Sequence, residues 1–238
     1  MKYWSRTGVG SLFHNTVTGL DKVFRTDIKR PKVVLVTGPP GSMKSSFIYS
    51  LLTSYLNQSG EFGVYTTLEE SVSSHLSNME SLGIQLCLNL QITDFTDIRE
   101  DHDNVDYLRF LERMLKHFKK VKGEQFTSFC LDSLGALYSL MDGEENMRKK
   151  MYHFFQLLRD LNLYSFIIME RSQDADPNLL GNEGFLGDGI IYLGLKRRQG
   201  RLSRFMQVEK MRASEHSMEL HALDMRMGRL CVLGPIFE

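Results

Sequence analysis

The amino-acid sequence has no excess of charge of either sign, no paired cysteine motif and no long apolar run. Lysine plus arginine and aspartate plus glutamate both number 29, so the formal net charge is zero and nothing indicates a bulk affinity for nucleic acid or anionic lipid. The 3 cysteines are scattered without a CxxC pair, which excludes a zinc ribbon and a disulfide scaffold and fits a reducing compartment. No run reaches the roughly 18 apolar residues of a membrane span, and the N-terminus contains no continuous apolar segment typical of a signal peptide. We therefore expect a cytoplasmic globular protein without membrane insertion.

Strand and helix patterns alternate through most of the chain. β-Branched and aromatic runs predict strands at 32–38, 63–68, 86–93, 126–131 and 164–169, and helical spacing of apolar residues predicts helices at 45–57, 70–82, 105–122 and 147–161. From residue 189 the pattern changes to short strands with tight turns, at 190–196, 202–210, 218–222 and 230–233. This order predicts an α/β fold whose mostly parallel sheet, flanked by helices, continues into a C-terminal antiparallel β-meander. We expect a single domain over 1–238, with an entry segment (1–30), an α/β core (31–188) and the meander (189–238).

The segment GPPGSMKSS, from residue 38 to residue 46, lies between a predicted buried strand and a predicted helix. Glycines allow a tight turn whose backbone N–H groups face an anion, and the helix N-terminus adds partial positive charge. In such a loop Lys44 would reach the β- and γ-phosphates of ATP, and the Ser45 hydroxyl would bind Mg²⁺. The expected nucleotide-binding residues are Gly38, Pro39, Pro40, Gly41, Ser42, Met43, Lys44, Ser45, Ser46 and Asp132.

Met43 stands where the phosphate-loop pattern GxxxxGK[ST] has its second glycine. A side chain at this position can crowd the loop, so a loop that binds nucleotide but hydrolyses it poorly is one alternative. A Gly-Pro turn before a helix, with no bound phosphate, is the other.

Acidic residues follow two of the predicted strands. Asp132 comes directly after the strand at 126–131, where it would hold Mg²⁺ opposite Ser45. Glu69 and Glu70 follow the strand at 63–68, at the sheet edge where open α/β folds bind ligands. One of these carboxylates would orient and deprotonate an attacking water. The alternative is a pair of glutamates favoured by a helix N-terminus, which suits Glu70 better than Glu69.

These motifs together resemble the KaiC-like branch of the RecA-type ATPases over nearly the whole chain. The matching segments are TGLDKVF (18–24), VLVTGPPGSMKSS (34–46), TLEES (67–71), FCLDSL (129–134), GDGIIYL (187–193) and VEKMRASEH (208–216). The resemblance implies a RecA-like P-loop NTPase core that assembles head-to-tail into a hexameric ring and binds ATP and Mg²⁺ between neighbours. It implies that Glu69 and Glu70 are the catalytic carboxylates. It also implies that Lys210 and Arg212, which leave one face of a strand, reach the γ-phosphate of the adjacent subunit.

The sequence differs from some members of this family at positions that matter for self-phosphorylation and for clock function. Gly184 and Phe185 stand where some members have a phosphate-accepting Ser-Thr pair, and the chain has one core domain where the clock protein has two. We therefore expect no clock function. A basic cluster, Lys196 to Arg204, is interpreted as a solvated hairpin or subunit contact in preference to a nucleic-acid surface, because only Phe205 beside it offers an aromatic ring for base stacking.

The sequence thus predicts a Mg-ATP-binding ATPase that hydrolyses ATP at subunit interfaces in a regulatory or signal-transducing role. One alternative is a nucleotide-binding assembly or adaptor module with little turnover, which Met43 favours. The other is a RecA-type DNA-repair ATPase. The sequence is compatible with a protein partner, but neither the identity of such a partner nor the cellular process is encoded in any motif.

Overall fold

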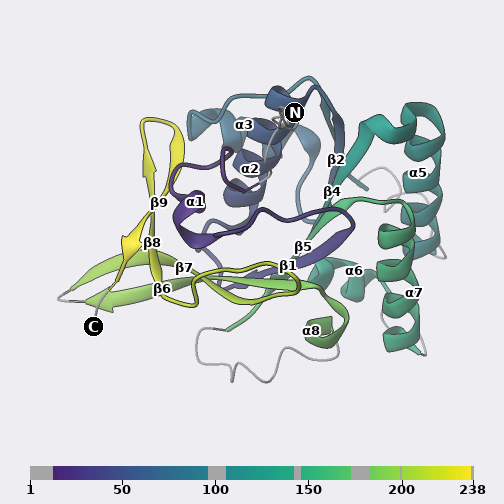
Figure 1. Ribbon diagram of the computed structural model, residues 1–238. Helices are drawn as coiled ribbons and strands as arrows, with labels where there is room; N and C mark the ends of the chain where they lie inside the picture. The colour runs from purple at the N-terminus through teal and green to yellow at the C-terminus, as the bar shows by residue number, and fades with distance from the viewer. Residues whose placement is uncertain (1–12, 96–105, 142–145, 173–182, 199, 237–238) are drawn as a thin grey trace, which may run out of the picture.

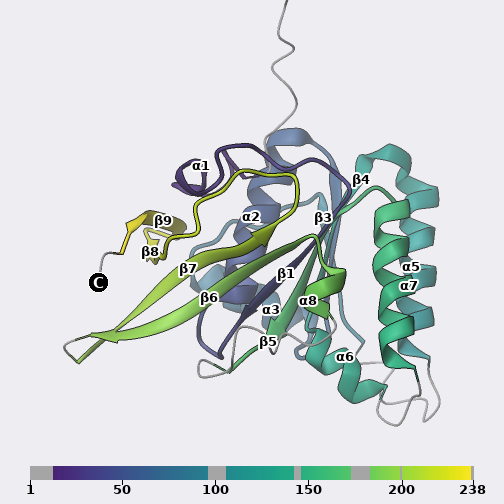
Figure 2. The same cartoon turned by 60° about the horizontal axis from the view of Figure 1, so that its bottom comes forward.

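The computed structural model describes residues 13–95, 106–141, 146–172, 183–198 and 200–236. These residues form one nine-stranded sheet with helices on both faces (Figures 1 and 2). The strands are β1 (Lys32–Gly38), β2 (Phe62–Thr67), β3 (Leu90–Thr93), β4 (Phe126–Asp132), β5 (Tyr164–Glu170), β6 (Gly189–Arg198), β7 (Arg201–Met211), β8 (His221–Arg226) and β9 (Arg229–Pro235). The helices are α1 (Leu20–Val23), α2 (Lys44–Ser59), α3 (Val72–Ser81), α5 (Tyr107–Lys122), the 3₁₀ turn η1 (Gly123–Gln125), α6 (Leu134–Leu140), α7 (Met147–Asp160) and α8 (Glu183–Leu186).

The strand order is β3-β2-β4-β5-β1-β6-β7-β8-β9. The first six strands pair in parallel, and β6 to β9 pair in an antiparallel manner. β6 therefore belongs to both parts, because it pairs in parallel with β1 and forms a hairpin with β7. This arrangement confirms the predicted α/β class with a C-terminal antiparallel extension.

Alternation along β1 explains why the sheet is covered on both sides. Val34 and Val36 pack in the cluster that contains α2, whereas Val33 and Leu35 pack in the cluster that contains α5, α6 and α7. Successive strand side chains point to opposite faces, so a continuous apolar run fits a strand that is buried on both faces. The carboxyl end of β1 is consequently held rigidly between two cores.

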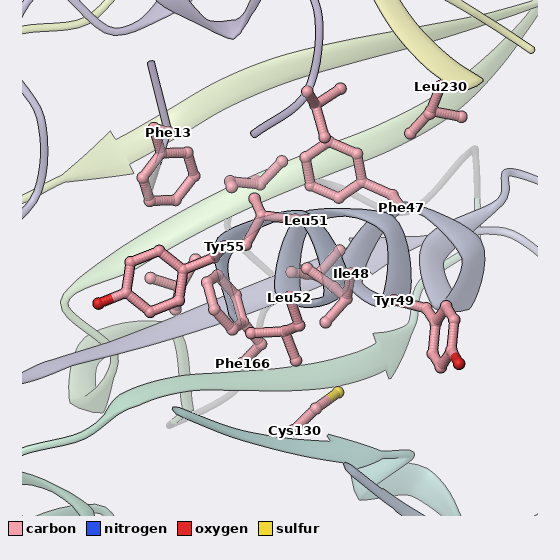
Figure 3. Close-up of a cluster of buried hydrophobic side chains, with 14 of the residues drawn as sticks. Phe13, Phe47, Ile48, Tyr49, Leu51, Leu52, Tyr55, Cys130, Phe166 and Leu230 are labelled. Carbon is pink, nitrogen blue, oxygen red and sulfur yellow. The ribbon is translucent and has the colours of Figure 1, made fainter. Parts of the chain in front are cut away.

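α2 lies in the middle of the first core (Figure 3). Its inner side packs on the sheet through Phe166 and Cys130, and its outer side is covered by Phe13 and Leu230. Lys44 is the one charged residue of this helix. A helix that is apolar on nearly all sides is stable only when it is covered all round, so the N-terminal segment and β9 complete its burial.

Several elements differ from the sequence-based prediction, and the four-residue helices α1 and α8 were not predicted. β3 starts at Leu90 and not at 86, because Leu86 and Leu88 are exposed and only imitate a strand pattern. β8 starts at His221 and not at 218, and the exposed Met218 instead accepts a hydrogen bond from the Gln207 side chain. The short helix α6 was not predicted, since its glycine masked the helical pattern. Residues 96–105, between β3 and α5, lie outside the described residues.

Candidate functional site at the phosphate loop

β1, β2, β4 and β5 run parallel, so their carboxyl ends meet at one edge of the sheet. A cleft of about 550 Å³ opens at this edge, within the range of roughly 300–1,000 Å³ typical of small-ligand sites. It is lined by Pro40, Gly41, Met43, Lys44, Ser45, Ser46, Glu69, Leu82, Asp132, Ser133, Ile168, Glu170, Arg204 and Met225. The structure therefore brings the phosphate loop, Glu69 and Asp132 together, and leaves Glu70, Lys210 and Arg212 elsewhere.

The loop between β1 and α2 requires backbone conformations that favour glycine. Gly38 has φ 151°, and a Cβ there would lie 1.9 Å from the Leu193 carbonyl oxygen. The buried Ser42 hydroxyl donates to the Pro39 carbonyl at 2.8 Å and closes the loop on itself. Met43 is the residue before α2 and adopts a left-handed conformation with φ 72° and ψ 32°. The position of the missing glycine is thus a left-handed position, which a methionine occupies here under strain.

Lys44 is nearly buried, and its ammonium group caps the loop. Its Nζ donates to the carbonyls of Gly38 at 3.0 Å and Pro39 at 3.1 Å. Burial lowers the pKa of Lys44, and the carboxylates of Glu170, Asp132 and Glu69 act in the opposite direction. A phosphate in the cleft would supply a stronger partner for this ammonium than two neutral carbonyls.

Asp132 is the last residue of β4 and is 8% exposed. The Tyr65 hydroxyl donates to its Oδ2 at 2.6 Å. Burial raises the pKa of Asp132, while hydrogen bonds from Tyr65 and Ser45 oppose that rise. The carboxylate and the Ser45 hydroxyl therefore lie beside each other, as expected for two oxygen ligands of one cation.

The two adjacent glutamates after β2 lie on different sides of their turn. Glu69 lines the cleft, and its Oε1 accepts a hydrogen bond from the Ser133 hydroxyl at 2.5 Å. Glu70 lies against α3, where its Oε2 accepts from Ser74 and Asn78, both at 2.9 Å. The resemblance implied that both residues are catalytic, whereas the placement of Glu70 agrees with the alternative of a glutamate at a helix N-terminus.

Lys210 and Arg212 lie at the other edge of the sheet. Lys210 donates to the carbonyls of Gly184 at 2.9 Å and Gly187 at 2.7 Å, and Arg212 lies 3.4 Å from Asp188. Asp188 in turn accepts from the backbone N–H of Val33, at the beginning of β1. Gly38 is five residues further along β1, which is roughly 16 Å at a strand rise of about 3.3 Å per residue. Lys210 and Arg212 therefore lie near each other, but they lie away from the phosphate loop of the same chain.

Four residues at or behind the cleft were not predicted as site residues from the sequence: Tyr65, Ser133, Glu170 and Arg204. Glu170 ends the apolar strand β5 and pairs with Gly38, so the rule that found Asp132 would also have found it. Arg204 belongs to the basic cluster, yet its Nε donates to the Gly41 carbonyl of the phosphate loop at 3.0 Å. Tyr65 and Ser133 carry no signal, because a tyrosine in a strand and a serine before a helix are ordinary.

This architecture, with its phosphate loop after β1 and acids at the neighbouring strand ends, defines a RecA-type α/β protein. The family described as "ATPase: KaiC" matches residues 14–234. The chain therefore belongs to the KaiC ATPase family, and the resemblance seen in the sequence is confirmed. No helix among the described residues is both long and apolar enough to cross a bilayer.

Individual relatives agree with this assignment. A UPF0273 protein of Pyrococcus furiosus is 27% identical over 230 residues, covering 87% of this chain and 88% of the relative. The circadian clock oscillator protein KaiC of a Nostoc species is 25% identical over 209 residues, which are 84% of this chain and 40% of the clock protein. The chain thus spans less than half the length of that relative. The crystal structure of a KaiC-like protein from Pyrococcus horikoshii has a TM-score of 0.75 at 22% identity, covering 92% of this chain and 97% of that one, and shows the fold.

Proposed function

We propose that this protein is a Mg-ATP-dependent ATPase that hydrolyses ATP at interfaces between copies of the chain, in a regulatory or signal-transducing role. Membership of the KaiC ATPase family supports the reaction class. The observation that carries the proposal is the convergence of Lys44, Ser45, Glu69 and Asp132 on one cleft. Together the four supply what phosphoryl transfer to water requires: a cation for the phosphates, two ligands for Mg²⁺ and a general base.

The donors in the cleft fit the nucleotide and the metal. Ser45 and Asp132 offer a hydroxyl and a carboxylate oxygen, which are hard ligands of the kind that Mg²⁺ prefers. Lys44 and the N-terminal N–H groups of α2 offer positive charge and hydrogen-bond donors, which suit phosphate. Bound Mg²⁺ would neutralise charge on the phosphates. Tyr65 keeps Asp132 in place by donating to Oδ2, so the acid is fixed before any ligand arrives.

Glu69 is the residue whose position suits a general base. Its carboxylate lies in the cleft and is held by the Ser133 hydroxyl through one oxygen. The other oxygen remains to accept a proton from an attacking water. Glu70 does not share this role in our proposal, because its carboxylate is engaged by α3.

Lys210 and Arg212 would complete a site in a neighbouring copy. Within one chain they lie at the opposite edge of the sheet from Gly38, as described above. A head-to-tail ring would place that edge against the phosphate loop of the next subunit. Cations supplied in trans would then offset the charge that develops on the transferring phosphoryl group.

A second candidate is a nucleotide-binding assembly module with little turnover. The left-handed conformation of Met43 favours it, because the loop carries a bulky side chain where the phosphate-loop pattern has glycine.

Calorimetry of a Lys44→Ala variant tests nucleotide binding at the loop. Loss of the ammonium should weaken ATP binding by roughly 1.5–3 kcal/mol, the usual contribution of a charge-assisted hydrogen bond. Lys116→Ala is the matched control, since Lys116 lies on α5 and pairs with Glu112. Equal ATP affinity in the Lys44 variant and the control would reject the assignment.

A further inference from the structure

His75, on the first turns of α3, is fully buried behind the cleft. Its ring packs against Tyr65, with centroids 4.6 Å apart, and against Tyr49 at 5.4 Å. Its Nδ1 lies 2.9 Å from Oε1 of Glu70. The equally buried Nε2 has no hydrogen-bond partner among the described residues.

Burying a histidine at this place lowers the stability of the fold unless one of its polar atoms is needed. Two tyrosine rings surround it, and an aliphatic side chain of similar volume would pack there without leaving a buried nitrogen unpaired. The contact between Nδ1 and Glu70 is therefore what histidine contributes and leucine would not. This contact occupies the carboxylate oxygen that Ser74 and Asn78 leave open.

Glu70 closes the turn that presents Glu69. The Thr67 hydroxyl donates to the Glu70 carbonyl at 3.1 Å, and the Leu68 N–H donates to the Asp132 carbonyl at 2.6 Å. The same imidazole also packs on Tyr65, which donates to Asp132. His75 therefore touches both supports of the cleft, the turn that carries Glu69 and the tyrosine that holds Asp132.

We propose that His75 is a positioning residue for the hydrolysis reaction: by fixing Glu70 against α3 it sets the turn that aims Glu69 into the cleft beside Asp132. This inference rests on the proposed function. It assigns no contact between His75 and nucleotide, so it predicts an effect on turnover and not on binding.

The test compares three substitutions of His75 by steady-state ATP turnover. His75→Leu keeps apolar bulk and loses the donor, so kcat should fall by about tenfold or more while KM for ATP stays within about twofold, as expected when a reacting group is misplaced. His75→Asn places an amide N–H near the former Nδ1 and should recover most of the turnover. His75→Gln places its amide near the former Nε2 and should not. Ser81→Ala removes a side-chain hydrogen bond within α3, to the Ser77 carbonyl, that does not involve Glu70, and it is the matched control, with turnover near that of the wild type.

Two results would overturn the proposal: a His75→Leu protein that turns over ATP as fast as the wild type, or an Asn variant that is no better than the Leu and Gln variants. A crystal structure of His75→Leu separates this failure from failure of the proposed function. We expect Glu69 to leave the Ser133 hydroxyl in that variant. If Glu69 keeps this hydrogen bond, the positioning role is wrong even where the wild type hydrolyses no ATP. If Glu69 moves and the wild type is inactive, the proposed ATPase function fails and the positioning by His75 stands.

Discussion

Two lysines at opposite edges of the sheet are bound in the same way but surrounded by opposite charges. Lys44 donates to the carbonyls of Gly38 and Pro39, and Lys210 donates to those of Gly184 and Gly187. Burial lowers the pKa of both. Carboxylates then oppose this shift at Lys44, whereas at Lys210 the neighbouring Arg212 lowers the pKa further and Asp188 raises it.

The difference indicates that the phosphate-loop edge has an excess of carboxylates and that the other edge has an excess of cations. The phosphate-loop edge combines one lysine with the carboxylates of Glu69, Asp132 and Glu170, which suits a metal-bound phosphate. At the other edge, Lys210, Arg159 and Arg212 lie around one carboxylate, that of Asp188, among the described residues. Complementary charge of this kind favours a defined head-to-tail contact. The experiments below test each side of this comparison.

Among the substitutions at the phosphate-loop edge, separate substitutions of Glu69 and Glu70 should have the largest effect on kcat. Glu69→Gln should lower kcat by on the order of 10²–10⁴, the usual contribution of a general base. Glu70→Gln keeps an oxygen and an amide for its partners on α3 and should lower kcat much less. Single-turnover hydrolysis with saturating ATP measures both. Equal losses in the two variants would show that the different placement of the carboxylates has no catalytic meaning.

Asp132→Asn should make the nucleotide-free protein more stable and the Mg-ATP complex weaker. Burial raises the pKa of Asp132 above its ordinary value of 3.8, so the ionised carboxylate destabilises the fold at neutral pH. The advantage of asparagine should be full above the folded pKa and fade as the pH falls toward 3.8. Denaturant unfolding across pH measures it. A variant less stable than the wild type at pH 7 contradicts the account.

Met43→Gly should have the smallest effect. The sequence alone predicts a slight loss of stability, because glycine is a poor helix residue. The structure places Met43 before α2 at φ 72°, where glycine relieves strain while some packing against the core is lost. Relief of roughly 1 kcal/mol corresponds to about a fivefold rise in turnover if the strain opposes hydrolysis. Unchanged turnover would mean that the loop accommodates methionine without penalty.

The sequence predicts the fold well, and the position of the loop between β1 and α2, because these signals are local. A β-branched run, a glycine turn and a helix occur in consecutive residues, and Asp132 follows its strand directly. The separate placement of Glu69 and Glu70 was predictable only in part. A helix N-terminus favours Glu70 over Glu69, but the side of the turn on which each carboxylate lies depends on contacts that Thr67 and Asp132 make. Tyr65 and His75 were missed for a similar reason. Their roles come from contacts between β2, α3 and β4, which no sequence period records.

Mixing two inactive variants is the most direct test of a site shared between copies. One variant carries Glu69→Gln and Glu70→Gln, and the other carries Lys210→Ala and Arg212→Ala. A cation supplied in trans contributes on the order of 10³–10⁵ in rate, so each variant alone should be nearly inactive. In mixed assemblies, verified by differently tagged chains, some interfaces pair an intact carboxylate site with an intact cation pair, and ATP hydrolysis should return. Mixed assemblies that remain as inactive as their parents would contradict a shared site.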